Sequence, residues 1–185
     1  MKKKLLITGF NPFGGESVNP AFEAVRLLPD EIAGFKLCKL EIPTEFIRSG
    51  VILKGALRTE QPDTVLCMGQ AGGRTAVTPE RVAINLMDAR IPDNTGYQPI
   101  DEPIAPDGPA AYFSTLPVKA IAERIQSAGL PAVVSNTAGT YVCNNLLYTL
   151  LHTAALEYPG LRGGFLHVPY AIEQLPGKPG DTFGM

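Results

Sequence analysis

Short apolar runs alternate with longer segments of helical periodicity along the chain. Five runs rich in Val, Ile and Leu have the length of a strand: residues 3–8, 36–42, 63–69, 132–136 and 163–168. Four segments between them favour helices, running from Asn19 to about Leu28, from Thr44 to before Pro62, from Pro117 to Ala128 and from near Val142 through Ala154. This alternation predicts an α/β fold, an α/β/α sandwich with a mainly parallel twisted sheet.

Residues 92–109 break the alternation. They hold five prolines and four acidic residues, and proline can neither donate to a sheet ladder nor continue a helix. We therefore expect a long loop or irregular arm here. A solvated connection is one interpretation, and a lid or a subunit contact is the other.

Length and charge limit the function classes. At 185 residues the chain has the size of one domain, so we expect residues 1–185 to form a single catalytic domain. The 16 Lys and Arg against 18 Asp and Glu provide no basic field for nucleic acid. Residues 125–156 lack charged side chains, but Pro131, glycines and asparagines interrupt them, which argues against a membrane span.

The three cysteines and two histidines allow only six Cys/His pairings. Because the cysteines are odd in number and form no C-x-x-C motif, reduced thiols in a cytoplasmic protein are favoured over a disulfide scaffold. Cys38 and Cys67 lie within predicted strands, where a thiol is usually inert. His152 follows Cys143 by nine residues, about 13 Å along one helix, so these two cannot exchange a proton.

Cys143 and His167 are the pair that the predicted fold brings together. Ligands of parallel α/β sheets bind beyond the carboxyl ends of the strands, where His167 and the segment leading into Cys143 both lie. At the start of a helix and beside an imidazole, the Cys143 thiol is expected to have a lowered pKa and to be largely thiolate near neutral pH. Its backbone N–H would face a developing oxyanion. A purely structural cysteine is the alternative on spacing alone.

The group that would orient the imidazole is not selected by periodicity. Glu80 is a candidate because it follows Thr78 and Pro79 shortly after a glycine-rich turn. The competing interpretation is an ion pair between Glu80 and Arg81 or Arg74 on a surface strand.

Three motifs resemble the signatures of the type I pyroglutamyl peptidases, also called pyrrolidone-carboxylate peptidases, a family of cysteine peptidases. The segment from Gly69 to Asn85 resembles the family's glutamate signature, and the segment from Val134 to Asn144 its cysteine signature. The first loop, Thr8–Phe13, and the histidine segment, Phe165–Pro169, are also similar. The resemblance extends from residue 5 to about residue 179.

The resemblance implies a cytoplasmic peptidase that removes an amino-terminal pyroglutamyl residue from peptides without a cofactor or metal. It implies a fold shared with nucleoside phosphorylases and a homo-oligomer, often a homotetramer. Cys143 would be the nucleophile, His167 the general base and acid, Glu80 the orienting group, and Arg90 would lie near the oxyanion. The residues matching the lactam pocket and its surroundings are Phe10, Phe13, Asn19, Thr44, Gln70, Ile91, Tyr141 and Val142.

The implied substrate fits the composition. A pyroglutamyl residue carries no α-ammonium group, only a flat neutral lactam, so aromatic walls and one or two polar contacts suffice to bind it.

The sequence departs from the family pattern in two places. The chain ends 18 residues after His167, whereas relatives usually continue through another helix, so a carboxyl-terminal tail is expected to be missing; and Tyr141 replaces a common phenylalanine.

Two other function classes compete with the peptidase. Glycine-rich turns after Thr8 and Leu66 also suit a phosphorylase-like enzyme or a phosphate-binding module of the same fold. However, the chain lacks G-x-x-x-x-G-K-[ST] and G-x-G-x-x-G, which weakens that interpretation. A non-catalytic interaction protein that uses the proline-rich arm is the third.

Overall fold

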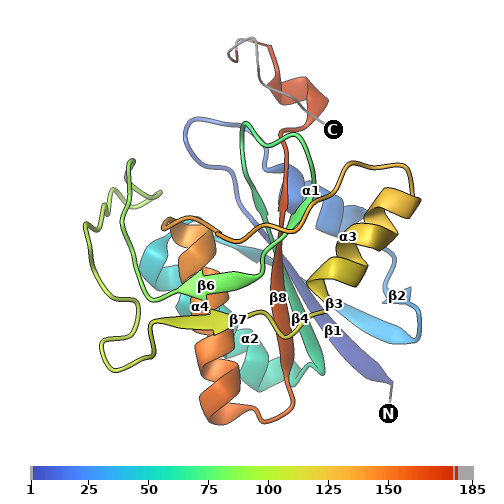
Figure 1. Ribbon diagram of the computed structural model, residues 1–185, viewed down its shortest axis with the longest axis horizontal. Coiled ribbons are helices and arrows are strands. Elements are labelled where there is room, and N and C mark those ends of the chain that lie inside the picture. Colours follow the sequence, from blue (N-terminus) through green and yellow to red (C-terminus); the bar gives the residue numbers. More distant parts are fainter. Residues whose placement is uncertain (1, 177, 179–185) are drawn as a thin grey trace.

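The computed structural model describes residues 2–176 and 178, and its centre is a six-stranded sheet (Figure 1). The strand order is β2-β3-β1-β4-β8-β5, where β1 is Lys3–Phe10, β2 Glu31–Ile32, β3 Phe35–Ile42, β4 Thr64–Gln70, β5 Thr78–Pro79 and β8 Arg162–Val168. The four inner strands run parallel, and only the short outer strands β2 and β5 are antiparallel to their neighbours. The predicted mainly parallel sheet is confirmed.

Helices cover both faces of this sheet. Helices α1 (Pro20–Leu27) and α3 (Val118–Ser127) lie on one face, and α2 (Phe46–Glu60) and α4 (Val142–Glu157) lie on the other (Figure 1). Successive side chains along a strand point to opposite faces of the sheet. Leu6 of β1 packs in the core under α2 and α4, whereas Ile7 packs under α1. The α/β/α sandwich is confirmed.

Close backbone contact fixes one of these layers. A side chain at Gly9 would meet the Cα atom of Phe22 in α1 at 2.5 Å, so only glycine lets this helix lie so near the strand. Asn19 caps α1 by accepting the N–H of Ala21, and Pro20 takes the first helical position, as the sequence predicts. Helix α2 begins two residues later than predicted, at Phe46 rather than Thr44.

The predicted strand at 132–136 is wrong. This segment runs beside β5 but forms only two isolated parallel bridges, Val77 with Ala132 and Glu80 with Ser135. Backbone hydrogen bonds join the two segments, with donors on alternate segments as in a parallel sheet. The donating N–H groups belong to Val77, Val133, Ser135 and Arg81. The rung between them would need an N–H at position 79, and Pro79 has none, so the ladder is broken.

The proline-rich segment at 92–109 has no helix or strand, as predicted, but its ends and turns are firmly held. The buried Asp93 carboxylate accepts hydrogen bonds from the backbone N–H groups of Phe46, Thr95 and Tyr97. The Asn85 side chain bonds to backbone atoms of Ala105 and Gly108. Strand β6 (Val82–Ile84) precedes this segment and strand β7 (Ala111–Phe113) follows it. These two strands form a separate antiparallel pair.

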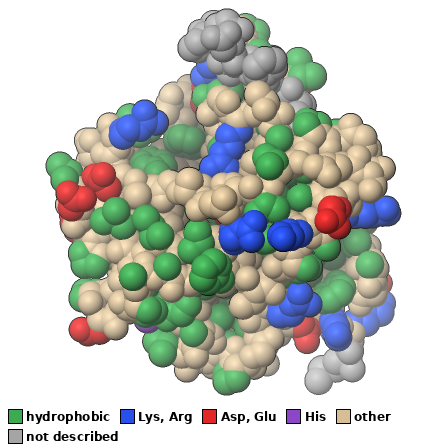
Figure 2. Space-filling model, in the orientation of Figure 1, with side chains coloured by type: hydrophobic (Ala, Val, Ile, Leu, Met, Phe, Trp, Pro, Cys, Tyr) green, Lys and Arg blue, Asp and Glu red, His purple; other side chains and the backbone are tan. Residues whose placement is uncertain are grey.

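The surface shows no single dominant charge on the face drawn in Figure 2. Lysine, arginine and acidic side chains are scattered singly or in small groups among apolar and uncharged ones. Within residues 2–176 and 178, no helix has the length and apolar character needed to cross a membrane. The last short element is a 3-10 turn, η1, at Ile172–Gln174.

Helix α4 carries much of the core, so its packing should dominate stability. We expect Leu147→Ala to lower the free energy of unfolding by about 2–5 kcal/mol, because Leu147 is fully buried and truncation leaves a cavity. Leu156→Ala, on the same helix at 68% exposure, should change it by less than about 0.5 kcal/mol. Urea unfolding of both variants checks this, and equal losses would contradict the packing described.

Candidate active site

Cys143 and His167 both lie at the carboxyl edge of the sheet, on either side of Gly69. His167 is in register with Gly69 on the neighbouring strand β4, and Cys143 stands in the first turn of α4. A side chain at Gly69 would lie 3.0 Å from the Cys143 sulfur and 2.8 Å from Phe165, so glycine makes room for the thiol. Phe165 and His167 point to the same face, with ring centroids 4.7 Å apart. The structure therefore places both predicted residues on the same face of the sheet edge, around Gly69.

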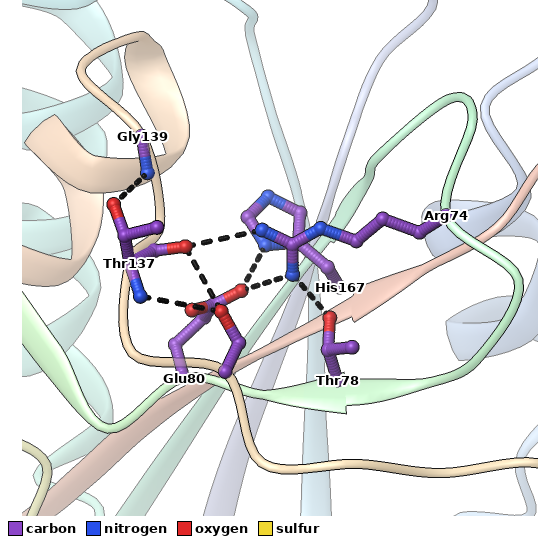
Figure 3. Close-up of polar contacts among 7 residues, drawn as sticks. Arg74, Thr78, Glu80, Thr137, Gly139 and His167 are labelled. Atoms are coloured by element: carbon purple, nitrogen blue, oxygen red, sulfur yellow. Dashed lines mark hydrogen bonds and ion pairs between the residues drawn. The ribbon is translucent and has the colours of Figure 1, made fainter.

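Glu80 is the partner of the imidazole. Its Oε1 atom lies 2.7 Å from Nδ1 of His167, and the two side chains are 0% and 4% exposed (Figure 3). Strand β5 places it, because Thr78 pairs with His167 and the Glu80 N–H donates to the Phe165 carbonyl. With a carboxylate accepting at Nδ1, that nitrogen carries the hydrogen and Nε2 is left free as the basic nitrogen.

Arg74 joins this pair from the loop after β4. Its guanidinium contacts Glu80 Oε1 at 2.5 Å, donates to the Thr78 hydroxyl, and donates to the Thr137 carbonyl at 3.1 Å (Figure 3). A turn from Ala71 to Arg74, with Gly73 at a φ of +85°, returns the chain toward β5. The predicted alternative of a Glu80–Arg74 ion pair is thus also present, but Glu80 is fully buried rather than on a surface strand.

The pKa of the Cys143 thiol differs from the value expected from the sequence. Burial, together with the Glu80 carboxylate, raises the pKa of the Cys143 thiol to about 12. Burial also lowers the pKa of His167, more than the hydrogen bond and charge of Glu80 raise it. The expectation of a lowered thiol pKa is wrong for the resting site, because it weighed the helix start and an imidazolium but left out desolvation.

Glu80 itself is held as a carboxylate. Burial acts to raise the pKa of this carboxyl, but the hydrogen bond and charge of His167, a hydrogen bond from Ser135 and the charge of Arg74 lower it below its ordinary value. The resting site therefore combines a thiol, a neutral imidazole and a carboxylate that is balanced by a guanidinium.

A hollow of about 570 Å³ lies beside the pair. Its lining comes from the residues after Gly69, the segment at 88–91, the residues leading into Cys143, the first loop and the residues after β8: Phe13, Gln70, Ala71, Gly72, Asp88, Arg90, Ile91, Gly139, Thr140, Tyr141 and Tyr170. Five predicted residues, Phe13, Gln70, Arg90, Ile91 and Tyr141, are among them. A second hollow of about 590 Å³ lies at the opposite edge of the sheet, lined by residues such as Asp63 and Arg162, with neither Cys nor His.

The other predicted pocket residues do not line this hollow. Phe10 and Val142 belong to the hydrophobic core, at 2% and 0% exposure. Asn19 caps α1 and donates to the Asn11 carbonyl, and the Thr44 hydroxyl donates to that same carbonyl. None of the four is among the residues that line the hollow. Tyr141 uses its hydroxyl to donate to the Pro92 carbonyl at 3.0 Å, which ties the proline-rich segment to the site.

The remaining cysteines and the second histidine lie elsewhere. Cys67 is fully buried, and burial raises the pKa of its thiol to about 12. Cys38 contacts Glu60, and His152 contacts the Tyr112 hydroxyl. No cluster of three or more His, Cys, Asp or Glu suited to a metal ion occurs in the part of the chain that the structure describes.

Arg74 contacts Glu80 in the site, but the sequence predicts it only as one of two possible surface partners of that residue. Asp88, Thr140 and Tyr170, which line the hollow, are not predicted from the sequence either. The signal that could have singled out Arg74 is its position directly after two glycines at a strand end, because such a turn can fold a long side chain back over the sheet edge.

Comparisons with known proteins give the same identification. The family model described as pyroglutamyl peptidase matches residues 3–183. A pyrrolidone-carboxylate peptidase of Streptococcus pneumoniae is 59% identical over 182 residues, which are 98% of this chain and 85% of that protein. Another, from Levilactobacillus brevis, is 59% identical over 177 residues, covering 96% of this chain and 87% of the relative.

Solved structures agree with these relatives. The crystal structure of pyroglutamyl peptidase I from Bacillus amyloliquefaciens matches with a TM-score of 0.96 at 50% identity, covering 100% of this chain and 88% of that one. The pyrrolidone carboxyl peptidase from Thermococcus litoralis matches with a TM-score of 0.91 at 43% identity, covering 96% and 81%. On this fold, with the three motifs meeting at one sheet edge, the chain belongs to the pyroglutamyl peptidase family.

Proposed function

We propose that this chain is a cysteine peptidase of the pyroglutamyl-peptidase I type, which hydrolyses the peptide bond after an amino-terminal pyroglutamyl residue. The proposal is supported by the hydrogen-bonded pair of His167 and Glu80 at the sheet edge where Cys143 begins α4, beside a partly aromatic hollow. Family membership supports the same reaction. No cofactor or metal is needed for it.

In the first half of the reaction, His167 takes the proton of the Cys143 thiol as the sulfur attacks the pyroglutamyl carbonyl carbon. A C–S bond forms, and the carbonyl oxygen becomes an oxyanion. When the C–N bond breaks, the imidazolium gives its proton to the leaving amine, and a thioester of Cys143 is left. Because the resting thiol is protonated, the thiolate and imidazolium form together during attack.

In the second half, water replaces the amine. His167 removes a proton from the water as its oxygen attacks the thioester, and the C–S bond breaks to release pyroglutamate. The proton returns to the Cys143 sulfur, so the enzyme ends as it began. Glu80 holds the imidazole in the tautomer with Nδ1–H and stabilises the imidazolium in both halves.

The oxyanion faces the start of α4 in this proposal. Tyr141, which precedes the helix, provides no side-chain cap, so the backbone N–H of Cys143 is available to an incoming oxygen. Arg90, exposed on the wall of the hollow, supplies a second donor. The positive end of the helix adds to both.

The lactam ring is assigned to the hollow. Phe13 and Tyr141, with ring centroids 6.1 Å apart, and Ile91 form its apolar walls, while Gln70 offers an amide to the lactam. Phe10, Asn19, Thr44 and Val142 would shape these walls from behind. The hollow contains both Asp88 and Arg90, so it presents no excess of one charge to a neutral ring.

Three further assignments belong to this proposal. A cytoplasmic location is supported by three free cysteines, which suit a reducing compartment. A homotetramer is supported by the family resemblance. One catalytic domain over residues 1–185 is supported by the single sheet edge that gathers all the site segments.

Replacing the nucleophile tests the reaction directly. We expect Cys143→Ser to reduce release of a fluorophore from a pyroglutamyl amide by at least about 10³-fold, because a hydroxyl is a far weaker nucleophile than a thiol paired with histidine. Cys38→Ser, which changes a thiol on β3 outside the site, should keep wild-type activity. Equal activity of wild type and Cys143→Ser would refute the proposal, and phosphate-dependent nucleoside cleavage would favour the phosphorylase-like alternative.

Replacing the orienting acid should change both rate and pH dependence. Glu80→Gln removes a charge and hydrogen bond that raise the pKa of His167, so the acid limb of kcat/KM should move to lower pH. The rate should fall by about 10²–10⁴-fold, since an amide can hold the wrong imidazole tautomer. Glu123→Gln, exposed on α3, is the matched control. A normal rate or an acid limb at higher pH would contradict the role of Glu80.

A further inference from the structure

We propose that Arg74 is a positioning residue, which fixes the Glu80 carboxylate toward His167 and ties this pair to the loop that carries Cys143. The inference rests on the proposed function, because it concerns the same catalytic pair. Neither the sequence motifs nor the comparisons assign Arg74 a role.

The Glu80 carboxylate is held through one of its two oxygens. Oε1 of Glu80 holds both contacts, at 2.7 Å to His167 Nδ1 and 2.5 Å to Arg74. Oε2 is buried and makes no hydrogen bond of ordinary geometry among the described residues, although the Ser135 hydroxyl is near enough to help lower the pKa of this carboxyl. With the His167 contact alone, the carboxylate could turn about that single bond or exchange its two oxygens. The guanidinium supplies the second point of attachment that prevents this.

Arg74 also connects Glu80 to the segment that leads into the nucleophile. The same guanidinium donates at 3.1 Å to the carbonyl of Thr137, six residues before Cys143. That carbonyl also accepts from the Ser135 hydroxyl, and the Thr137 hydroxyl accepts from the Gly139 N–H (Figure 3). Gly139 and Tyr141 then line the hollow and lead into α4. Arg74 therefore bridges the acid and the segment that sets the position of the thiol.

Arg74 also brings a positive charge to the pair. The titratable groups facing Cys143 and His167 come from four segments: Glu80 after β5, Arg74 in the loop after β4, Cys67 on β4 and Tyr141 before α4. Of these four, Arg74 alone is cationic. It lowers the pKa of both Cys143 and His167, against the Glu80 carboxylate, which raises both. Loss of its charge should move the ionisations of the pair to higher pH together.

The test compares Arg74→Gln, which removes the charge, with Arg74→Lys, which keeps it but cannot contact Glu80, Thr78 and Thr137 in one plane. Arg162→Gln, exposed at the opposite end of β8, is the control for loss of one positive charge. Two readouts are measured across pH: kcat and KM for a pyroglutamyl amide, and the rate at which iodoacetamide alkylates Cys143, located by mass spectrometry. Thermal unfolding of each variant is measured alongside.

For Arg74→Gln we expect both limbs of the pH profile and the alkylation curve to move up by about 0.5–1 pH unit. Its kcat should fall by roughly 10- to 100-fold with little change in KM, since misplacement of the acid and thiol affects the reaction rather than binding. Arg74→Lys should keep the wild-type pH limits while kcat is lowered. Arg162→Gln should match wild type in all of these.

Several results would overturn the inference. Unchanged pH limits and kcat in Arg74→Gln, with only a lower unfolding temperature, would make Arg74 structural. A raised KM at unchanged kcat would make it a binding residue. If Arg74→Gln does not fold, Arg74→Lys decides, because wild-type kcat in that variant would exclude the bridging role.

The same experiment separates this inference from the proposed function. If the wild-type enzyme does not hydrolyse the pyroglutamyl amide, the proposed function fails. If the wild type is active and Arg74→Gln behaves identically in both readouts, the inference about Arg74 fails while the function stands. Alkylation needs no substrate, so it reports on the Cys143 thiolate in either case.

Discussion

A buried carboxylate beside an imidazole is the constraint on which the rest of the site depends. Glu80 has no exposed surface, and an ionised carboxylate in that position is strongly unfavourable unless partners compensate for its lost hydration. His167 and Arg74 are those partners, and each is placed by a different strand end. Antiparallel pairing of β5 with β8 sets Glu80 against His167, and the turn after β4 returns Arg74 to the same oxygen.

This arrangement explains why the site need not hold a thiolate at rest. Glu80 and Arg74 balance each other, and burial keeps both the thiol and the imidazole neutral before substrate arrives. Charge separation between Cys143 and His167 then accompanies attack, when the helix start and the oxyanion donors can stabilise it. A neutral lactam can enter such a site without the loss of hydration that a charged group would suffer.

The sequence predicts most of the strands and helices and the Cys143–His167 pair. It does not predict the pKa of the Cys143 thiol. Periodicity predicts the inner strands and the four helices, since their apolar faces and capping residues are local signals. The Cys143–His167 pair follows from strand ends and helix length. Glu80 came from the family resemblance, because its position depends on the antiparallel strand β5, which is only two residues long and has no periodic signal.

Where the prediction failed, a non-local effect prevailed. The strand expected at 132–136 is interrupted because Pro79, on the neighbouring segment, lacks the N–H that one rung requires. The sequence predicts too low a pKa for the Cys143 thiol because desolvation depends on what α4 packs against. The sequence does not single out Arg74, because its three partners, Thr78, Glu80 and Thr137, come from separate parts of the chain.

The central claim is that Cys143, activated by His167, forms a covalent intermediate with the pyroglutamyl group. Rapid acid quenching of the wild-type enzyme with a pyroglutamyl ester, followed by intact-protein and peptide mass spectrometry, tests it most directly. The account predicts a pyroglutamyl thioester on Cys143 alone, which forms more slowly in His167→Ala and is absent in Cys143→Ala. Turnover without any adduct on Cys143, or an adduct on Cys38 or Cys67 instead, would contradict it.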